Sequence, residues 1–367
     1  MTKFSNINFE NYGYYPRLRT RVAELNGLRH LTDERKDKII PLLSLGKWPK
    51  ATNFDGAANK IPEIFQNRPY FLDLTDEKNT YADDRSNLKS SHNGYENWIN
   101  YIQKFENAIP ILQIENKGSL RDFTQQARKC ENFFGKLGFV IQDFNNDINK
   151  VISALSSIDD VENAMVFIDS KYIRNSYPAI LAANIAAINK IREDIPSANI
   201  TTLSTSFPSS LASFSNNGQG RTGAIEILER QLHGELGGYE VSNYGDYASI
   251  HGVVYDDAPE IMRWAARVDY PKEQNWLFER RPKCTAKSDF QDAAKAILED
   301  NPEIGTRDIW GEKMIKGTAC DPNFDEIGFG PASWISVRVN IHLSKQIDFS
   351  EMMLSSPEEE LDEDLDF

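Results

Sequence analysis

The chain has 367 residues, 40% of them hydrophobic and 26% charged, and a formal net charge of -14. These values are ordinary for a soluble globular protein, and the negative balance argues against broad binding to a nucleic-acid backbone, which depends on Lys and Arg. No apolar run approaches the roughly 18 residues of a membrane span, and residues 1–10 lack a secretory pattern, so we expect a cytoplasmic protein. Three well-separated cysteines without a Cys-x-x-Cys pair predict neither a disulfide framework nor a zinc ribbon.

Short apolar runs alternate with helix-like stretches through most of the chain. The runs are residues 39–45, 70–75, 108–114, 138–142, 164–169, 200–206, 239–244 and 263–270. Most are about thirty residues apart, which is the spacing that parallel strands joined by helical crossovers require. The pattern predicts an α/β fold of the closed (β/α)8 TIM-barrel type.

The remaining segments suggest three regions. Residues 1–38 are expected to form an N-terminal arm and helix, and residues 39–349 the barrel with a C-terminal extension. In that extension, residues 263–270 and 275–280 predict a hairpin across Pro271, and the alternation over residues 334–343 predicts a further strand. Residues 350–367 are expected to be a disordered acidic tail.

Three short motifs resemble the beta protein family of phages and bacterial mobile elements. They are Tyr14-Tyr15-Pro16-Arg17-Leu18 followed by Glu24, then Tyr244-Gly245-Asp246-Tyr247, and last Trp276-Leu277 followed by Trp334, Arg338 and His342. The resemblance implies a barrel-like fold and a setting in phage and host genomes, but no particular activity. Two departures put shared catalysis in doubt: Ser44-Leu45 stands where the family often has an acid, and Ile341-His342 where it often has two histidines.

The barrel prediction places a site at the carboxyl ends of the strands, where side chains distant in sequence converge. Four aspartates there, Asp73, Asp143, Asp169 and Asp246, would repel one another unless Mg²⁺, Mn²⁺ or an arginine lay among them. The alternative is that each acid caps a helix or pairs with a nearby cation. Asp246 is the first choice for a functional acid, although Gly245 also fits a tight turn in which Asp246 bonds to backbone.

Further residues complete the candidate site. The catalytic candidates are Asp246, Asp169, Lys171 and His342, and the ligand-binding candidates are Arg221, Arg281, Tyr247, Trp334 and Arg338. Residues 218–222 could offer amides to a phosphate at the start of a helix, although a flexible connector explains the same glycines. His342 fits either catalysis or a structural role.

The acidic tail offers a second kind of site. Residues 358–367 carry seven acidic side chains and no basic one, and the end Asp364-Leu365-Asp366-Phe367 is similar to the acidic tips with which single-stranded DNA-binding proteins recruit partners. Such a tip would dock into a basic, apolar pocket of a protein partner.

These observations leave three functional hypotheses. The leading one is a phage or mobile-element accessory protein in phage-host conflict, whether antiviral defence or counter-defence, that binds a partner on a barrel scaffold. The alternative is a metal-dependent hydrolase of a phosphorylated or nucleotide ligand, with Asp73, Asp143, Asp169 and Asp246 around the metal. The third is nucleic-acid binding by a local basic patch of Arg17, Arg19, Arg21 and Arg29.

Overall fold

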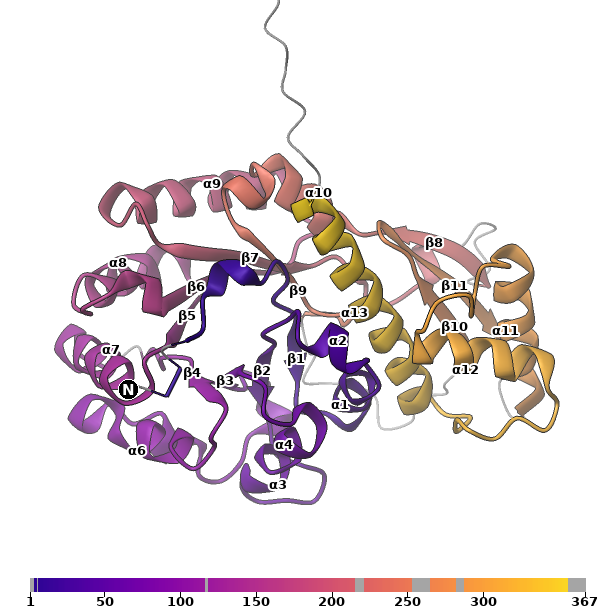
Figure 1. Ribbon diagram of the computed structural model, residues 1–367, viewed down its shortest axis with the longest axis horizontal. Helices are drawn as coiled ribbons and strands as arrows, with labels where there is room; N and C mark the ends of the chain where they lie inside the picture. Colours follow the sequence, from indigo (N-terminus) through magenta and orange to yellow (C-terminus); the bar gives the residue numbers. More distant parts are fainter. Residues whose placement is uncertain are drawn as a thin grey trace, which may run out of the picture.

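A computed structural model describes residues 3–4, 6–115, 118–214, 221–252, 265–281 and 287–355 (Figure 1). Its strands form two parallel four-stranded sheets, ordered β1-β2-β3-β4 and β5-β6-β7-β9, and an antiparallel sheet ordered β10-β11-β8. The strands are β1 Arg17–Arg19, β2 Leu42–Leu45, β3 Tyr70–Leu74, β4 Ala108–Pro110, β5 Leu137–Ile141, β6 Ala164–Tyr172, β7 Asn199–Thr205, β8 Thr222–Glu226, β9 Asn243–Asp246, β10 Ala266–Pro271 and β11 Asn275–Arg281.

Helices connect the parallel strands and cover their outer side, as Figure 1 shows for α6 to α9. The α-helices are α1 Val22–Arg29, α2 Asp33–Lys36, α3 Asp55–Ala58, α4 Lys60–Phe65, α5 Arg85–Leu88, α6 His92–Ile102, α7 Leu120–Phe134, α8 Phe144–Leu155, α9 Tyr177–Asp194, α10 Leu228–Glu235, α11 Lys287–Asp300, α12 Trp310–Cys320 and α13 Pro331–Ser355. Short 3-10 turns are η1 Phe9–Asn11, η2 Lys78–Thr80, η3 Val161–Asn163, η4 Ala212–Phe214 and η5 Gly238–Glu240. None of the helices in the described ranges is both long and apolar enough to cross a membrane.

Single β-bridges join the two parallel sheets at both of their edges. At one edge Ile111 bridges Gly138, and the Leu112 amide donates to the Gly138 carbonyl at 2.9 Å. At the other edge Tyr14 bridges Tyr244, and the Tyr15 amide donates to the Tyr244 carbonyl at 2.9 Å. The first and last parallel strands, β1 and β9, are therefore neighbours in space.

Aromatic rings fill the space between the two parallel sheets. Phe71 on β3 and Phe167 on β6 meet edge to face with centroids 5.1 Å apart, and Tyr15 lies 6.0 Å from Phe167. All three side chains are fully buried. Strands of the two different sheets thus share one core. Large rings suit this core, because each of them buries a large apolar area.

Seven of the eight predicted strands belong to the parallel sheets, and the eighth is also a strand but lies in the antiparallel sheet. Residues 266–270 lie in β10, which pairs antiparallel with β11, as the hairpin prediction required. The prediction omitted the parallel strand β1, which pairs with β2 from Arg17 to Arg19. This strand lies in the segment expected to be an arm. Three residues behind a proline are too few to show any apolar period, so the sequence pattern could not identify this strand.

The strand predicted over residues 334–343 was wrong, because these residues lie within helix α13. Figure 1 shows α13 between the parallel strands and the antiparallel sheet, and it packs against both α1 and β10. Residues 336–347 of this helix are all buried. A helix that is covered on every side has no single apolar stripe, so alternating Val337, Val339 and Ile341 imitated a strand.

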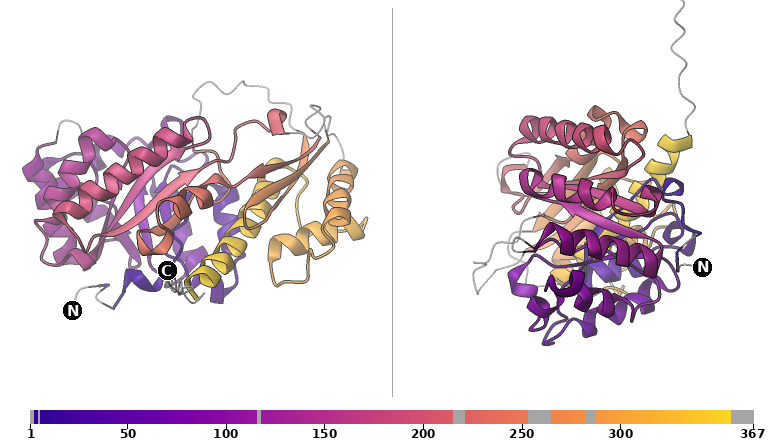
Figure 2. Two further views of the ribbon diagram at one scale, coloured as in Figure 1. Left: turned by 90° about the horizontal axis from the view of Figure 1, so that it is seen from above. Right: turned by 90° about the vertical axis from the view of Figure 1, so that its left-hand side faces the viewer.

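The antiparallel sheet forms a second, smaller core with α11 and α12. The two views of Figure 2 place this unit beside the parallel strands, with α13 between the two. Phe290 of α11 stacks on Trp334 of α13 at 5.3 Å, and both lie in this core. Trp334, predicted to bind a ligand, is therefore a packing residue.

Candidate functional site

A pocket of about 350 Å³ opens at the carboxyl ends of the parallel strands. Its lining residues come from the ends of β1, β2, β3, β5, β6 and β9 and from the loops that follow them: Arg17, Arg19, Ser44, Thr75, Asp76, Glu77, Lys78, Gln142, Lys171, Tyr247 and Gly252. This location agrees with the sequence prediction, because parallel strands deliver their terminal side chains to a common edge. We call these residues the mouth pocket.

A buried arginine forms the floor of the mouth pocket. The Arg17 guanidinium donates from Nη1 to Asp169 Oδ2 at 2.7 Å and from Nε to Ser44 Oγ at 3.0 Å, and Nη2 lies 3.5 Å from Asp73 Oδ2. Burial alone would lower the pKa of Arg17, but the surrounding acidic groups, Asp169 and Asp73 among them, raise it. An arginine therefore lies between two of the aspartates predicted to hold a metal.

Asp169 has no oxygen left for another ligand. Besides Arg17 it accepts hydrogen bonds from the Gln142 amide nitrogen at 2.8 Å, from the Tyr247 hydroxyl at 2.7 Å and from the Lys171 backbone amide at 3.0 Å. Four donors on one buried carboxylate fix its orientation. Asp169 thus binds together β1, β5, β6 and the residue after β9.

Asp73 is the less satisfied of the two acids. Its partners are Arg17 and the Gln113 amide nitrogen, which donates at 3.0 Å. Burial raises the pKa of Asp73, and the nearby Arg17 charge opposes this increase. Asp73 therefore has fewer hydrogen-bond and ion-pair partners than Asp169.

The predicted basic patch does not exist as an exposed cluster. Arg17 is buried, and Arg19 pairs with Glu24 at 2.8 Å and with Glu77 at 2.6 Å. Glu77 also pairs with Arg21 at 2.6 Å. These carboxylates cancel the charge that a phosphate backbone would need, so the nucleic-acid hypothesis loses its structural basis.

Lys171 enters the mouth pocket from an irregular part of β6. The register between β6 and β7 shifts between Asp169 and Tyr172, and Lys171 has a φ of 52°. A lysine rarely adopts this left-handed conformation, and here Asp169 stabilises it by accepting the Lys171 amide. Lys171 lines the pocket at this bulge, and such irregularities are common beside binding sites.

Asp246 lies outside the mouth pocket, in a second buried network. It accepts hydrogen bonds from the Tyr14 hydroxyl at 2.7 Å, the Tyr244 hydroxyl at 2.8 Å, the Ala248 amide at 2.8 Å and His342 Nε2 at 2.8 Å. Burial would raise the pKa of Asp246, but His342 and the other donors lower it overall. Asp246 and Tyr247 are consecutive on an extended chain and face opposite sides, so only Tyr247 reaches the pocket.

His342 completes this second network. The Trp276 indole nitrogen donates to His342 Nδ1 at 3.2 Å, so the ring proton resides on Nε2 and points at Asp246. Both histidine nitrogens are occupied and the side chain is fully buried. The arrangement joins β9, β11 and α13 and leaves neither group accessible to a substrate.

The glycine of the central motif has a packing reason. A Cβ on Gly245 would lie 3.0 Å from the Tyr15 carbonyl oxygen and 3.1 Å from that of Thr202. Gly245 therefore allows β9 to fit between β7 and the N-terminal segment. The turn beyond it contains Ala248 and Ser249, both with positive φ, and Asp246 binds the backbone there as the alternative interpretation expected.

The other predicted site residues lie away from the mouth pocket. Asp143 is exposed and caps α8, accepting from the Asn146 amide at 3.2 Å. Arg221 is exposed just before β8, and Arg281 on β11 pairs with Glu279 at 2.6 Å. Arg338 pairs with Asp269 at 2.7 Å, and burial lowers the pKa of Arg338 to about 10. Residues 215–220 and 356–367, which include the phosphate-loop glycines and the predicted tail contacts Asp364, Leu365, Asp366 and Phe367, lie outside the described residues.

The four predicted metal ligands are consequently not assembled around one point. Asp73 and Asp169 share Arg17, Asp143 caps a helix and Asp246 binds His342. In the described ranges no group of three or more His, Cys, Asp or Glu side chains is arranged to hold a metal ion. The geometry gives Mg²⁺ or Mn²⁺ no support at this site.

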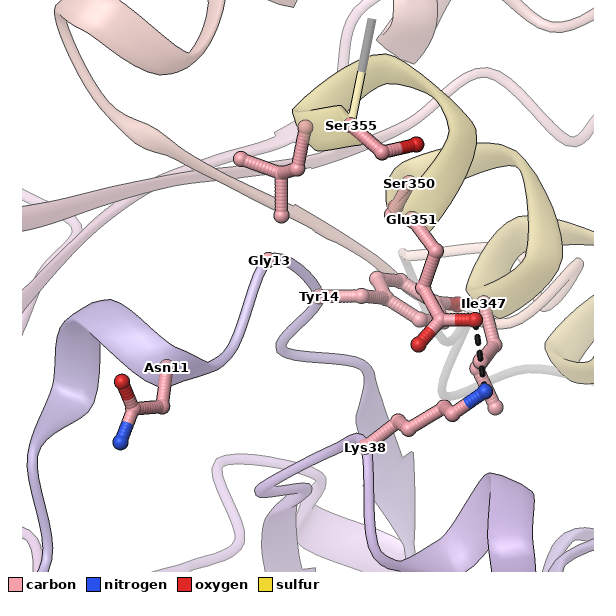
Figure 3. Close-up of a pocket in the computed structure, with 9 residues that line it drawn as sticks. Asn11, Gly13, Tyr14, Lys38, Ile347, Ser350, Glu351 and Ser355 are labelled. Carbon is pink, nitrogen blue, oxygen red and sulfur yellow. Dashed lines mark hydrogen bonds and ion pairs between the residues drawn. The ribbon is translucent and has the colours of Figure 1, made fainter.

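A second pocket, of about 440 Å³, lies near the amino ends of β1 and β2, against the last turns of α13 (Figure 3). Its charged lining residues are Lys38 and Glu351, which form an ion pair at 2.7 Å. Tyr14 lines it as well, with its hydroxyl turned to Asp246. The charges of this pocket neutralise each other, so the mouth pocket is the stronger candidate.

Sequence reasoning missed the central role of Arg17 and Tyr14. Both lie in the Tyr14-to-Leu18 motif, which was interpreted only as part of the N-terminal arm and as a family resemblance. The available signal was the conflict among the strand-end acids, which requires a cation between them. Arg17 was already named, but in a surface patch.

Comparison with known proteins agrees with this assignment of motifs. The profile of the Beta protein family matches residues 14–348, which include all three motifs. The chain is also 45% identical over 348 residues to "Protein beta" of Enterobacteria phage P4, a match that covers 95% of this chain and 96% of the phage protein. The chain therefore belongs to the Beta protein family.

Proposed function

We propose that this protein is an accessory factor in phage-host conflict that acts by binding a partner rather than by catalysis. Its family membership associates it with phages, and the relative from Enterobacteria phage P4 aligns over almost its whole length. The role in conflict and the partner are our inference. They rest on the state of the buried acids, on the architecture and on the composition of the C-terminal segment.

The observation that carries the proposal is the full use of two buried acids. Asp169 and Asp246 each accept hydrogen bonds from four groups of the protein itself. A general base or nucleophile needs a free lone pair within reach of its substrate. In this arrangement both acids have a structural role, and so do the family-motif residues Tyr14, Asp246 and His342.

We further propose that the two parallel sheets act as one closed eight-stranded β/α ring. The bridges Ile111–Gly138 and Tyr14–Tyr244 at the two seams support closure. The shared core of Phe71 and Phe167 supports it independently. A ring of this kind is a rigid scaffold whose binding surfaces lie on its loops and added elements.

The partner surface that we propose is the end of α13 with the acidic segment that follows it. Met352, Met353 and Leu354 are about half exposed, whereas most apolar side chains of α13 are buried. Residues 358–367 then add seven acidic side chains. Apolar residues followed by acids fit a partner protein with a basic, apolar groove.

Phage plating on host cells that express the chain tests this proposal. The parent is expected to change the plating efficiency of at least one phage in a panel, and a chain ending at residue 355 is expected to lose the effect. A matched control changes seven exposed acids of the body to amides and is expected to keep it. No effect of the parent on any phage would contradict the role in conflict, while an unchanged effect after truncation would contradict the acidic segment alone.

A further inference from the structure

We propose that the mouth pocket binds a small phosphate monoester, of the size of a sugar phosphate or a mononucleotide, through Lys171. This inference does not depend on the role in phage-host conflict or on the acidic segment. It rests on the position and size of the pocket, on its local charge and on the conformation of Lys171.

The position and size fit a small polar ligand. The pocket lies at the carboxyl ends of parallel strands, where α/β proteins place their ligands. Its volume of about 350 Å³ is near the lower end of the range for small-molecule sites. Ten of its eleven lining residues carry a polar or charged side chain, which suits a hydroxylated molecule.

The charge around the pocket has the opposite sign to the chain as a whole. Ion pairs in and around it join Arg17, Arg19, Arg21, Arg85 and Lys89 to the five carboxylates Glu24, Asp73, Asp76, Glu77 and Asp169. Lys171 comes in addition, and its ammonium group has no ion-pair or hydrogen-bond partner among the described residues. In a chain of net charge -14, a pocket with a surplus cation selects anions.

The left-handed backbone conformation of Lys171 indicates that this residue serves a function in the pocket. A φ of 52° is costly for a residue with a Cβ, by about 1 kcal/mol or more. The ammonium group has no hydrogen-bond or ion-pair partner among the described residues, yet the bulge that follows Asp169 places Lys171 in the lining of the pocket. Strain of this kind concentrates at ligand-binding positions.

The available donors favour phosphate over carboxylate. A carboxylate ligand is best recognised by a free, planar arginine fork, but Arg17 and Arg19 are already committed to internal acids. A lysine ammonium acts as a point charge and serves the tetrahedral phosphate group well. Gln142 donates to Asp169, and its carbonyl oxygen, which has no donor among the described residues, is left to accept from a ligand hydroxyl.

Calorimetric titration in phosphate-free buffer with ribose 5-phosphate and adenosine monophosphate tests the proposal, with ribose and succinate as the uncharged and carboxylate controls. We expect at least one phosphate ester to bind, binding to weaken as salt is raised to about 0.5 M, and neither control to bind. Lys171→Asn is expected to weaken binding about tenfold or more, because asparagine tolerates the positive φ but carries no charge. Lys190→Asn, on the exposed side of α9, is expected to leave it unchanged.

A labelling experiment on the parent chain keeps the proposal testable if Lys171→Asn fails to fold. Ribose 5-phosphate is expected to slow the reaction of Lys171 with an amine-directed reagent and to leave Lys190 unaffected. The absence of both heat and protection with the phosphate esters would overturn the proposal. So would equal binding of succinate, or unchanged affinity in a folded Lys171→Asn variant.

Discussion

The hydrogen-bond network around Asp246 predicts a large loss of stability for Asp246→Asn, although the change alters almost no volume. His342 presents an Nε2 proton to Asp246 because its Nδ1 accepts from Trp276. If the asparagine oxygen replaces Oδ1 beside Tyr14 and Ala248, its amide group faces that proton, so two donors meet in a buried site. An unmatched buried donor costs about 1–3 kcal/mol and the loss of charge-assisted bonds about 1 more, so we expect about 3 kcal/mol in total.

Urea unfolding followed by tryptophan fluorescence measures this loss, with Asp143→Asn as the matched control. Asp143 undergoes the same chemical change at an exposed helix N-cap, where asparagine is as good as aspartate, so the free energy of unfolding should change little. Trp276→Phe frees His342 Nδ1, so in that background Asp246→Asn should cost about 1 kcal/mol less. Losses at positions 246 and 143 that agree within about 1 kcal/mol would refute the reasoning.

Two further predictions concern other buried positions. Burial raises the pKa of Glu229 to about 7, above its ordinary value, so the folded state holds this proton more tightly than the unfolded chain. The stability of the parent relative to Glu229→Gln should then fall by up to about 3 kcal/mol as the pH rises from 5 to 8, and a difference that does not vary with pH would contradict this. A Cβ on Gly27 in α1 would lie 2.7 Å from Val339 Cγ1 of α13, whereas Gly234 in α10 has no atom within 4 Å. Gly27→Ala should therefore lower the melting temperature. Gly234→Ala should raise the melting temperature slightly, because it increases the free energy of unfolding by about 0.5–1 kcal/mol. A stabilising Gly27→Ala would show that α1 and α13 are less tightly packed than described.

Much of the fold was predictable because parallel strands leave a regular spacing of apolar runs. Asp73, Asp169, Lys171 and Tyr247 were expected in the site, and they do lie at or directly beneath the mouth pocket. That expectation needs only the rule that carboxyl ends of parallel strands share an edge.

What failed had local physical causes. Arg17 lies on a three-residue strand, and its role depends on tertiary pairing that no periodicity reveals. Asp246 was expected in the mouth pocket. Successive side chains of an extended strand point to opposite sides, so Asp246 faces His342 and Tyr247 faces the pocket. Within residues 334–343, buried polar residues of α13 such as Arg338 looked like the polar face of a strand. The partner of Arg338, Asp269, lies on β10 and could not be identified from the sequence pattern.

The pairing of Tyr14 with Tyr244 has a consequence for biosynthesis. Tyr14 and Asp246 are 232 residues apart in sequence, and at about 5–20 residues per second a ribosome needs on the order of ten to fifty seconds to make the intervening chain. Throughout that interval the β1 edge that β9 later covers has no partner of its own. A nascent chain of this protein must therefore keep its opening strand from pairing elsewhere, and synonymous codons that slow translation before residue 246 would prolong its exposure to aggregation.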